Sequence, residues 1–520
     1  MSQTLIHSRA VLCSFIGALL LISAGCATSS FTPFETGVKP TAHPLVAQYS
    51  VTHYRPGFSA WVEFGTDITY GRRTSVVSDS SSISGGAVVN VLVAGMLPKT
   101  TYHMRAHVDS QSGSWVDDDH TFTTGAIGVN LFAAGSGTIS AGGPSGTTAA
   151  NATGTGPAPG IELLTLASIA ATDLSGNVIW YCPQNAFPAK LLTNGHFLLV
   201  TPSDLLEVDL ACNVVRDVSL AQVNQSLQAG GYSFTVPPSL GFPGGAPFHH
   251  DVLALPNGHW IALCQIEKTF TDLSDHPGTN NVAGDALIDI DPNGNVVWAW
   301  SGFDKLNQYI DRNLQGWPDW THSNAILYTA DGNLLLSVRH QSWILKIDYE
   351  NGTGNGDVLW RLGDGGDFTL LAEDASQWFY AQHNPYIVNA NGSQTTLALF
   401  DNGNLRLDPT GTIPCGSAST AATCYSRAIV LQIDESTHIA NLLWEYLPGY
   451  YSYWGGNASV LPNGNVEFDA TIPFGSLASQ ITEMTQTDNP QIVWQMNISG
   501  QNAYRGMRIP SLYPGVTWQK

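Results

Sequence analysis

Three stretches of the chain each place a histidine ahead of a short apolar run that ends in a Gly-containing turn. They read "FHHDVLALPNGHWIAL", "WTHSNAILYTADGNLLLSVRH" and "AQHNPYIVNANGSQTTLALFDNGN", and they supply His250, His322 and His383. Imidazole can act as nucleophile, acid or base near neutral pH. A hydrogen-bonded turn residue is the plainer interpretation of any one of them. Their recurrence at the start of successive repeats instead predicts that the three rings meet at one site.

The polar residues near these histidines are mostly hydrogen-bond donors, namely Asn324, Arg339, His340, Asn402, Arg406 and Arg427. Arg339, in "LLLSVRHQS", lies on the strand that we expect to return from the one begun by His322. A planar guanidinium matches the paired oxygens of sulfate or carboxylate. Donors around neutral imidazoles therefore favour an anionic substrate. An ion pair with Asp331 or Asp364 is the alternative role for Arg339.

A metal site is the rival interpretation of the three histidines, because imidazole is a common metal ligand. No carboxylate lies at a fourth matching position, and no CxxC or His/Cys spacing of a zinc centre occurs in the chain. We therefore predict neither a metal nor another cofactor.

The elements that must position these residues form a repeat. Its unit ends in an Asp-containing turn followed by β-branched residues and Trp. The endings are "TDLSGNVIWYC", the degenerate "EVDLACNVVRDV", "IDIDPNGNVVWAW", "KIDYENGTGNGDVLWRL", "QIDESTHIANLLWEY" and "EMTQTDNPQIVWQM". Six such units predict a six-bladed β-propeller over residues 160–520, in which first strands converge on a central channel. Stacked sandwiches leave the fixed order of the repeat unexplained. The final "YRGMRIPSLYP" is expected to close the ring.

Two segments precede the propeller. Residues 31–125 contain short alternating strands separated by turns and predict a small β-sandwich. Within them, "VLVAGMLPKTTYHMRAHV" resembles the corner of fibronectin type III-like domains, which implies that Leu97, Pro98, Thr101 and Tyr102 pack there. Residues 126–159 are rich in Gly, Ser, Thr and Pro, so we expect a linker or surface loop. The whole protein is thus predicted to be all-β.

Composition excludes one class of partner. The 520 residues include 20 Lys+Arg against 41 Asp+Glu, a formal net charge of −21 at pH 7. An acidic chain with no dense cationic stripe is unsuited to a phosphate backbone, so no nucleic-acid partner is predicted.

Residues 1–26 predict a targeting segment. Arg9 precedes the apolar run "AVLCSFIGALLLIS", and "SAGC" follows it, which resembles a bacterial lipoprotein signal with Cys26 lipidated. An uncleaved membrane anchor is the alternative. We expect an exported protein, periplasmic or anchored at the outer membrane, that meets a membrane only through this lipid. Export permits disulfides, for which Cys415 with Cys424 is the easiest pair and Cys182 with Cys212 a second.

The motifs "HHDVLALPNG", "DWTHSNAILY", "SVRHQSWILKID", "WRLGDGGDF", "AQHNPYIV" and "LFDNGN" resemble the successive blade motifs of bacterial aryl sulfate sulfotransferases, over residues 31 to 520. This resemblance implies a six-bladed propeller behind an N-terminal β-sandwich, working without a nucleotide sulfate donor. It implies that His383 is the catalytic histidine that becomes sulfated. The other catalytic residues that it implies are His322, Asn324, Arg339 and a histidine of the "HHD" motif, where we prefer His250 over His249.

The implied reaction moves a sulfuryl group from an aryl sulfate ester to a phenolic acceptor through a sulfohistidine, in ping-pong fashion. One of His250 and His322 would protonate the departing phenolate and later deprotonate the acceptor. Nearby aromatic residues could hold aryl rings, namely Trp320, Trp378, Phe379, Tyr380, Tyr450, Tyr451, Tyr453 and Trp454. The rival functions are a non-catalytic propeller that binds an anionic glycan or protein, and a metal-dependent lyase or hydrolase. The natural substrates and a homodimeric state stay open.

Overall fold

The computed structural model describes residues 34–79, 86–143, 156–239, 245–310, 312, 315–371, 378–407, 411–412, 414–417, 424–472 and 476–519. The predicted signal segment and Cys26 lie outside the described residues. The protein is all-β, with many four-stranded antiparallel sheets. The described helical elements are α1 (Leu220–Ala229), α2 (Gly302–Lys305) and the 3-10 turns η1 (Asn307–Tyr309), η2 (Arg339–Gln341), η3 (Glu350–Gly352) and η4 (Cys415–Ser417). No described helix is long and apolar enough to cross a membrane.

Two sheets form the N-terminal part of the described chain. The first contains β1 (Phe34–Pro40), β2 (Ala47–His53) and β6 (Ala87–Val93), and the second contains β3 (Phe58–Gly65), β4 (Arg72–Arg73), β5 (Val77–Ser78), β7 (Thr101–Ser110), β8 (Gly113–Val116) and β9 (His120–Thr123). Buried residues alternate along β2, β3 and β7, so each strand turns one face to a shared core. At the expected corner, the Leu97 amide donates to the Tyr102 hydroxyl over 3.0 Å.

Six further sheets of the described chain are built around antiparallel meanders, to which β35, β26 and β10 each add an edge strand. The first three contain β11 (Ile161–Thr165), β12 (Ile169–Thr172), β13 (Val178–Cys182) and β35 (Gly506–Ile509); β14 (Phe187–Leu191), β15 (Phe197–Val200), β16 (Asp204–Val208) and β17 (Val214–Ser219); and β18 (Phe248–Ala254), β19 (Trp260–Thr271), β20 (Thr279–Ile290) and β21 (Val296–Ser301). The last three contain β22 (Ser323–Tyr328), β23 (Leu334–Val338), β24 (Trp343–Ile347) and β25 (Val358–Leu362); β26 (Thr369–Leu371), β27 (His383–Asn391), β28 (Gln394–Asp401), β29 (Arg427–Asp434) and β30 (Ile439–Tyr446); and β10 (Thr138–Gly142), β31 (Asn457–Val460), β32 (Val466–Ile472), β33 (Ala478–Met484) and β34 (Ile492–Ser499).

The Trp residues of the sequence repeat tie each of these sheets to the next. Each indole N–H donates to the outer hairpin turn of the following sheet. The pairs are Trp180 to Leu210, Trp298 to Gly354, Trp360 to Glu435, Trp444 to Thr487 and Trp494 to Leu174. The degenerate second member has Arg216 instead, which donates to the Asp291 carbonyl oxygen over 2.5 Å. Because Trp494 of the last sheet contacts the first, the six links form a closed ring.

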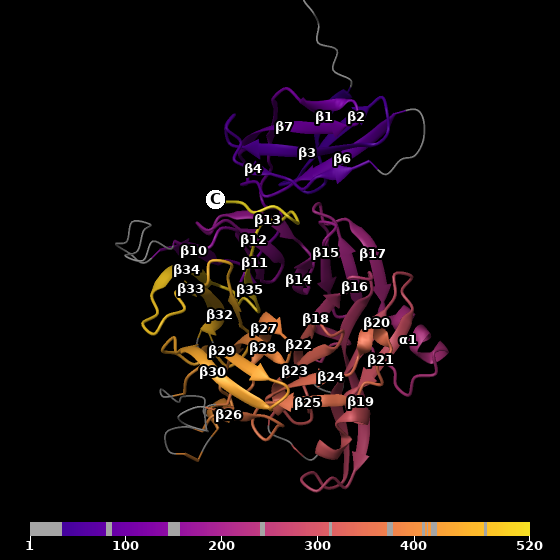
Figure 1. Cartoon of the computed structure of the whole chain (residues 1–520), viewed down its shortest axis with the longest axis vertical. Helices are drawn as coiled ribbons and strands as arrows, with labels where there is room; N and C mark the ends of the chain where they lie inside the picture. The colour runs from indigo at the N-terminus through magenta and orange to yellow at the C-terminus, as the bar shows by residue number, and fades with distance from the viewer. Residues whose placement is uncertain are drawn as a thin grey trace, which may run out of the picture.

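First strands of successive sheets lie against one another, from β14 through β18, β22 and β27 to β31. The C-terminal strand β35 pairs with β11 and contacts β32, so the expected closing strand is confirmed. Inner strands are therefore covered on both faces: residues 282–290 of β20 and all of β24 are buried, the charged residues among them included. Figure 1 places the N-terminal sheets at one end of the molecule, with the C-terminal residues between them and the other sheets.

The segment 126–159 differs from the linker that its composition predicts. Its strand β10 pairs with β34 at the outer edge of the last sheet. A sheet edge needs only backbone partners, so a segment too small and polar to build a core can still add a strand there. Both expected disulfides are present, Cys182 to Cys212 and Cys415 to Cys424, while Cys264 is buried and free.

Candidate active site

The three predicted histidines come together, although dozens of residues separate them in the chain. His250 lies in β18, His322 immediately precedes β22, and His383 begins β27. The rings of His250 and His322 have centroids 4.8 Å apart. The Tyr504 ring joins them, with its centroid 5.5 Å from that of His250 and 6.0 Å from that of His383. We call these four residues the histidine cluster.

The histidines do not occupy equivalent register positions, which corrects the simple repeat interpretation. In each of the three sheets, the first two strands form a hairpin whose register shifts near its start. The residue pair immediately before the first shift is Phe248 with Cys264, Ser323 with Val338, and His383 with Phe400. His322 therefore lies one residue before this position and His250 two residues after it. Both have left-handed backbones, with φ of 49° and 57°. Such values are uncommon outside glycine and cluster where a side chain must be aimed.

His383 has a fixed tautomer. Its Nδ1 lies 2.7 Å from Asn402 Oδ1, and Asn402 Nδ2 donates to the carbonyl oxygens of Ser452 and Gly455. The two carbonyl acceptors settle the amide orientation, so Nδ1 of His383 must carry the hydrogen. Nε2 then holds the lone pair, and it accepts a long 3.3 Å contact from the Gly455 amide. A neutral imidazole with a lone pair on Nε2 is a competent nucleophile.

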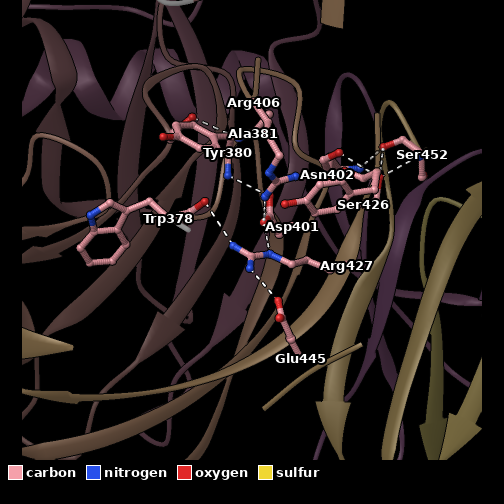
Figure 2. A network of polar contacts seen from close by, with 12 residues as sticks. Trp378, Tyr380, Ala381, Asp401, Asn402, Arg406, Ser426, Arg427, Glu445 and Ser452 are labelled. Atoms are coloured by element: carbon pink, nitrogen blue, oxygen red, sulfur yellow. Dashed lines mark hydrogen bonds and ion pairs between the residues drawn. The ribbon is translucent and has the colours of Figure 1, made fainter. Parts of the chain in front are cut away.

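A network of buried charges holds Asn402 in place (Figure 2). The neighbouring Asp401 accepts from Arg427 Nε over 2.7 Å, from Arg406 and from the Tyr380 amide. Arg427 also pairs with Glu445. Burial acts to raise the pKa of the Asp401 carboxyl, but the positive charges of Arg406 and Arg427 outweigh it and hold that pKa below its usual range. Arg406 and Arg427 were expected among the donors near the histidines, and both pair with Asp401.

His322 contacts a carboxylate. Its Nδ1 pairs with Asp319 Oδ2, while Asp319 Oδ1 receives the Gln265 amide over 3.3 Å. Asp319 is 6% exposed, whereas the His322 side chain is 29% exposed. The ring is thus held on its Nδ1 side, and Nε2 is left for a substrate.

His250, and not His249, belongs to the cluster. The two Nδ1 atoms are 2.6 Å apart. His249 is 3% exposed, and its Nε2 lies at ion-pair distance, 3.3 Å, from Asp285 Oδ1. The ring of His250 instead packs on Phe187, Tyr504 and His322. His249 therefore supports His250 from behind.

Arg339 lies in η2 and is 5% exposed. Its Nη1 is 2.7 Å from His340 Nε2, and its Nη2 donates to the Tyr453 carbonyl oxygen. The alternative ion pair is not formed: Asp331 pairs with Lys346, and no described carboxylate pairs with Arg339. The Arg339 Nε has no hydrogen-bond partner among the described residues. The guanidinium is thus buried without an anion beside the histidines.

One described group has atoms that could hold a metal, namely Asp319, His322 and His340. The His340 ring is already used at both nitrogens, by the Asp319 carbonyl oxygen over 2.6 Å and by Arg339. A cation there would also face the Arg339 guanidinium. The donor set therefore does not fit a metal ion.

The remaining predicted residue, Asn324, spans two sheets. Its Nδ2 donates to the Gln382 carbonyl oxygen over 2.7 Å, and its own carbonyl oxygen accepts from Arg505. Arg505 is 1% exposed and also lies 3.5 Å from Asp251. Sequence reasoning missed Tyr504 and Arg505. The available signal was a Tyr-Arg pair immediately before the closing strand, which we used only to predict closure.

Of the predicted aromatic residues, Trp320 and Phe379 are fully buried in the core. Trp454 is 40% exposed, and its ring lies 6.4 Å from that of Tyr504 at an angle of 19°. It is thus placed to hold an aryl ring at the edge of the cluster.

The electrostatics of the cluster keep the imidazoles of His250 and His383 neutral. Burial, and then the adjacent His249 and His322, lower the pKa of His250 well below its usual range. Burial, and then Arg339, lower the pKa of His383 in the same way, against the opposing hydrogen bond that its Nδ1 donates to Asn402. Burial raises the pKa of Tyr504 to about 12, so its hydroxyl stays protonated. Neutral rings beside buried guanidinium groups are suited to an anion.

The chain is similar to a known protein family and to several solved structures. A family profile described as "Arylsulfotransferase (ASST)" matches residues 159–505. No curated protein matches the chain. Similar solved structures include a protein of unknown function from Bacteroides caccae, 11% identical with a TM-score of 0.37, covering 65% of this chain and 94% of that one. Virginiamycin B lyase from Staphylococcus aureus is 10% identical with a TM-score of 0.27, covering 70% and 99%. The family profile spans well over half of the chain and every residue of the histidine cluster, so the chain belongs to the arylsulfotransferase family and is a sulfotransferase enzyme.

Proposed function

We propose that the protein transfers a sulfuryl group from an aryl sulfate ester to a phenol, without a nucleotide donor, and that His383 carries the group between the two. One observation carries this proposal. The His383 ring has its proton fixed on Nδ1 by Asn402 and its lone pair on Nε2, inside a cluster that contains a buried guanidinium.

In the first half-reaction, the Nε2 lone pair of His383 attacks the sulfur of the donor. The nitrogen–sulfur bond forms as the bond from sulfur to the aryl oxygen breaks, and its electron pair leaves on that oxygen. A proton delivered to the oxygen completes the phenol. In the second half-reaction an acceptor phenol loses its proton and attacks the sulfur, which returns His383 to its neutral form.

The sulfuryl oxygens need donors in both steps. Arg339 and Asn324 are the proposed ones, together with His250 and His322. Arg505 adds a second buried positive charge next to the cluster. Donors that are already in place before the reaction stabilise developing charge without reorganisation.

The further assignments stand as part of the same proposal. Residues 160–520 form a six-bladed β-propeller, which the closed ring of Trp and Arg216 links supports. Residues 31–125 form a fibronectin type III-like sandwich domain, with 126–159 between the two. The protein is exported as a lipoprotein attached through Cys26, in the periplasm or at the outer membrane. A homodimer is the assembly to test by light scattering.

The test is acceptor dependence. Purified protein should release phenol from an aryl sulfate much faster when a second phenol is present. Brief exposure to donor alone should leave one sulfuryl group on the tryptic peptide 362–406, which contains His383. Equal release without acceptor would indicate a sulfatase, and no release would favour a binding protein. Loss of activity with a chelator would favour a metal-dependent lyase or hydrolase.

A further inference from the structure

We infer that Asp319 is a positioning residue that makes His322 the acid and base of the reaction, the group that protonates the leaving phenolate and later deprotonates the acceptor. This inference rests on the proposed function and assigns a role that the family match leaves open. It follows from what lies against Nδ1 of each histidine in the cluster.

The three Nδ1 partners differ in charge. His383 has the neutral amide oxygen of Asn402, and His250 has the ring nitrogen of His249. Only His322 has a carboxylate, that of Asp319. A carboxylate on Nδ1 fixes the tautomer and stabilises the imidazolium that forms when Nε2 takes a proton. His322 is therefore the ring that can carry a proton.

Hydrogen bonds fix the position of Asp319. The Gln265 amide donates to Oδ1, and the Asp319 carbonyl oxygen accepts from His340 Nδ1 over 2.6 Å. Its backbone also pairs with β20, because the Trp320 amide donates to the Ala283 carbonyl oxygen over 2.9 Å. Oδ2 is thus aimed at His322 by contacts on three sides, as a positioning carboxylate requires.

His250 is the poorer candidate for the same task. An imidazolium on His250 would face Arg505, whose charge opposes it, and the anion Asp285 is reached only through His249. The groups that face His322 are Asp319, the rings of His250 and His340, and beyond them His383 and Arg339. Burial and the neighbouring His322 hold the pKa of His340 well below its usual range, so His340 adds no charge.

The solvent exposure of the histidines also favours His322 as the acid and base. The His322 side chain is 29% exposed, whereas His383 is 2% exposed. The leaving phenol must depart toward solvent, away from the buried nucleophile. In the first half-reaction, His322 gives its Nε2 proton to the aryl oxygen and keeps its Nδ1 hydrogen on Asp319. In the second, Nε2 takes the hydroxyl proton of the acceptor, so no net proton is gained.

The experiment compares two donors that differ in leaving group. Phenolate needs a proton as it leaves, whereas 4-nitrophenolate is stable without one. Pre-steady-state release of the phenol, without acceptor, isolates the first half-reaction. In Asp319→Asn and His322→Gln, phenyl sulfate should slow by about 10²- to 10³-fold. With 4-nitrophenyl sulfate the same variants should slow by less than about tenfold, because little general-acid assistance is then lost.

Asn402→Ala is the matched control. It disturbs the nucleophile and should slow both donors by a similar factor. Asp319→Glu keeps the charge and should recover part of the rate on phenyl sulfate. A loss in Asp319→Asn and His322→Gln that is equal for both donors would overturn the inference.

The sulfuryl label on peptide 362–406 separates this result from the proposed function. Label from 4-nitrophenyl sulfate in the wild type and in both variants, with no selective loss on phenyl sulfate, would refute only the role of Asp319. Absence of label in the wild type would refute the proposed function itself. Circular dichroism and thermal melts identify a variant that has not folded, in which case His322→Gln decides alone.

Discussion

The protein contains two buried polar clusters in which the charges are arranged differently. In one of them, which we call the carboxylate cluster, Arg508 pairs with Glu162, Glu467 and Glu483, and Asp469 lies near Glu162. Arg508 of β35 pairs with Glu162 of the first sheet and with two glutamates of the last sheet, so it ties the ends of the ring together. In the histidine cluster, the rings of His250 and His383 are held neutral beside guanidinium groups, and no described carboxylate pairs with Arg339. The contrast teaches that opposite charges hold the ring closed at β35, whereas Arg339 has no carboxylate partner among the described residues and is therefore the donor that we propose for the sulfuryl oxygens.

The largest effect should come from the nucleophile. His383→Asn should lower steady-state transfer on the order of 10⁴-fold or more, because the covalent route is lost. Its denaturation midpoint should stay close to that of the wild type, since the residue contributes to chemistry and not to closure. Turnover and urea denaturation measure the two quantities. Transfer that survives in this variant would place the nucleophile elsewhere.

Arg508→Met tests the other cluster. It leaves several buried carboxyl groups without their cation, and it should lower the free energy of unfolding by about 3–5 kcal/mol. Activity per folded molecule, assayed at low temperature, should change little. An unchanged denaturation midpoint together with a loss of activity would contradict the assignment of Arg508 to ring closure.

Acid should weaken the histidine cluster. The folded protein holds the pKa values of His250, His340 and His383 below their usual range, so below about pH 6.5 the unfolded chain binds more protons. Stability is therefore fully present above that pH and is lost as the pH falls, by about 1.4 kcal/mol per pKa unit for each ring. Urea midpoints at pH 7.5 and 5.5 measure this loss. His383→Asn should show a smaller loss than the wild type, and an identical loss would show that this ring is not held neutral.

The smallest effect concerns Asp469, which is fully buried and has no well-aligned hydrogen bond to either carboxylate oxygen. Burial, and then Glu162, raise the pKa of Asp469 well above its usual range. The folded state thus retains a proton that the unfolded chain releases above about pH 4, so stability falls as the pH rises. Asp469→Asn should add about 1–3 kcal/mol at pH 7 and little at pH 4. Equal destabilisation at both pH values would mean that this carboxyl group is needed structurally.

Much of the architecture could be predicted from the chain because the signals are local. Alternating apolar residues and the Asp-turn-Trp endings predicted all-β sheets, and the five tryptophans bind the next hairpin in each case. The Cys415–Cys424 disulfide followed from its short loop, whereas Cys182–Cys212 was only a second possibility. The strand β10 escaped prediction because its partner β34 lies more than 300 residues away, and backbone pairing leaves no mark in side-chain composition.

The candidate site was likewise predictable only in part from the sequence. The histidine repeat and the "SVRH" motif indicated which residues approach one another, because strands that begin a repeat converge. They could not show that Asp401 occupies Arg406 and Arg427, nor that Tyr504 and Arg505 enter from the closing strand. The contacts of Tyr504 and Arg505 depend on residues that are distant in the chain, and the pairing of Arg406 with Asp401 depends on how the loop between them folds.

The sequence by itself determined the family, the all-β architecture and the three histidines, since each is written in short repeated patterns. Only the tertiary structure decided what each histidine faces: the amide of Asn402, the carboxylate of Asp319 or the ring of His249. Three identical side chains acquire different chemistry because the protonation and the tautomer of an imidazole are set by the group on its other nitrogen. In two of the three cases a register shift or a turn brings in that group, and no repeat pattern encodes it.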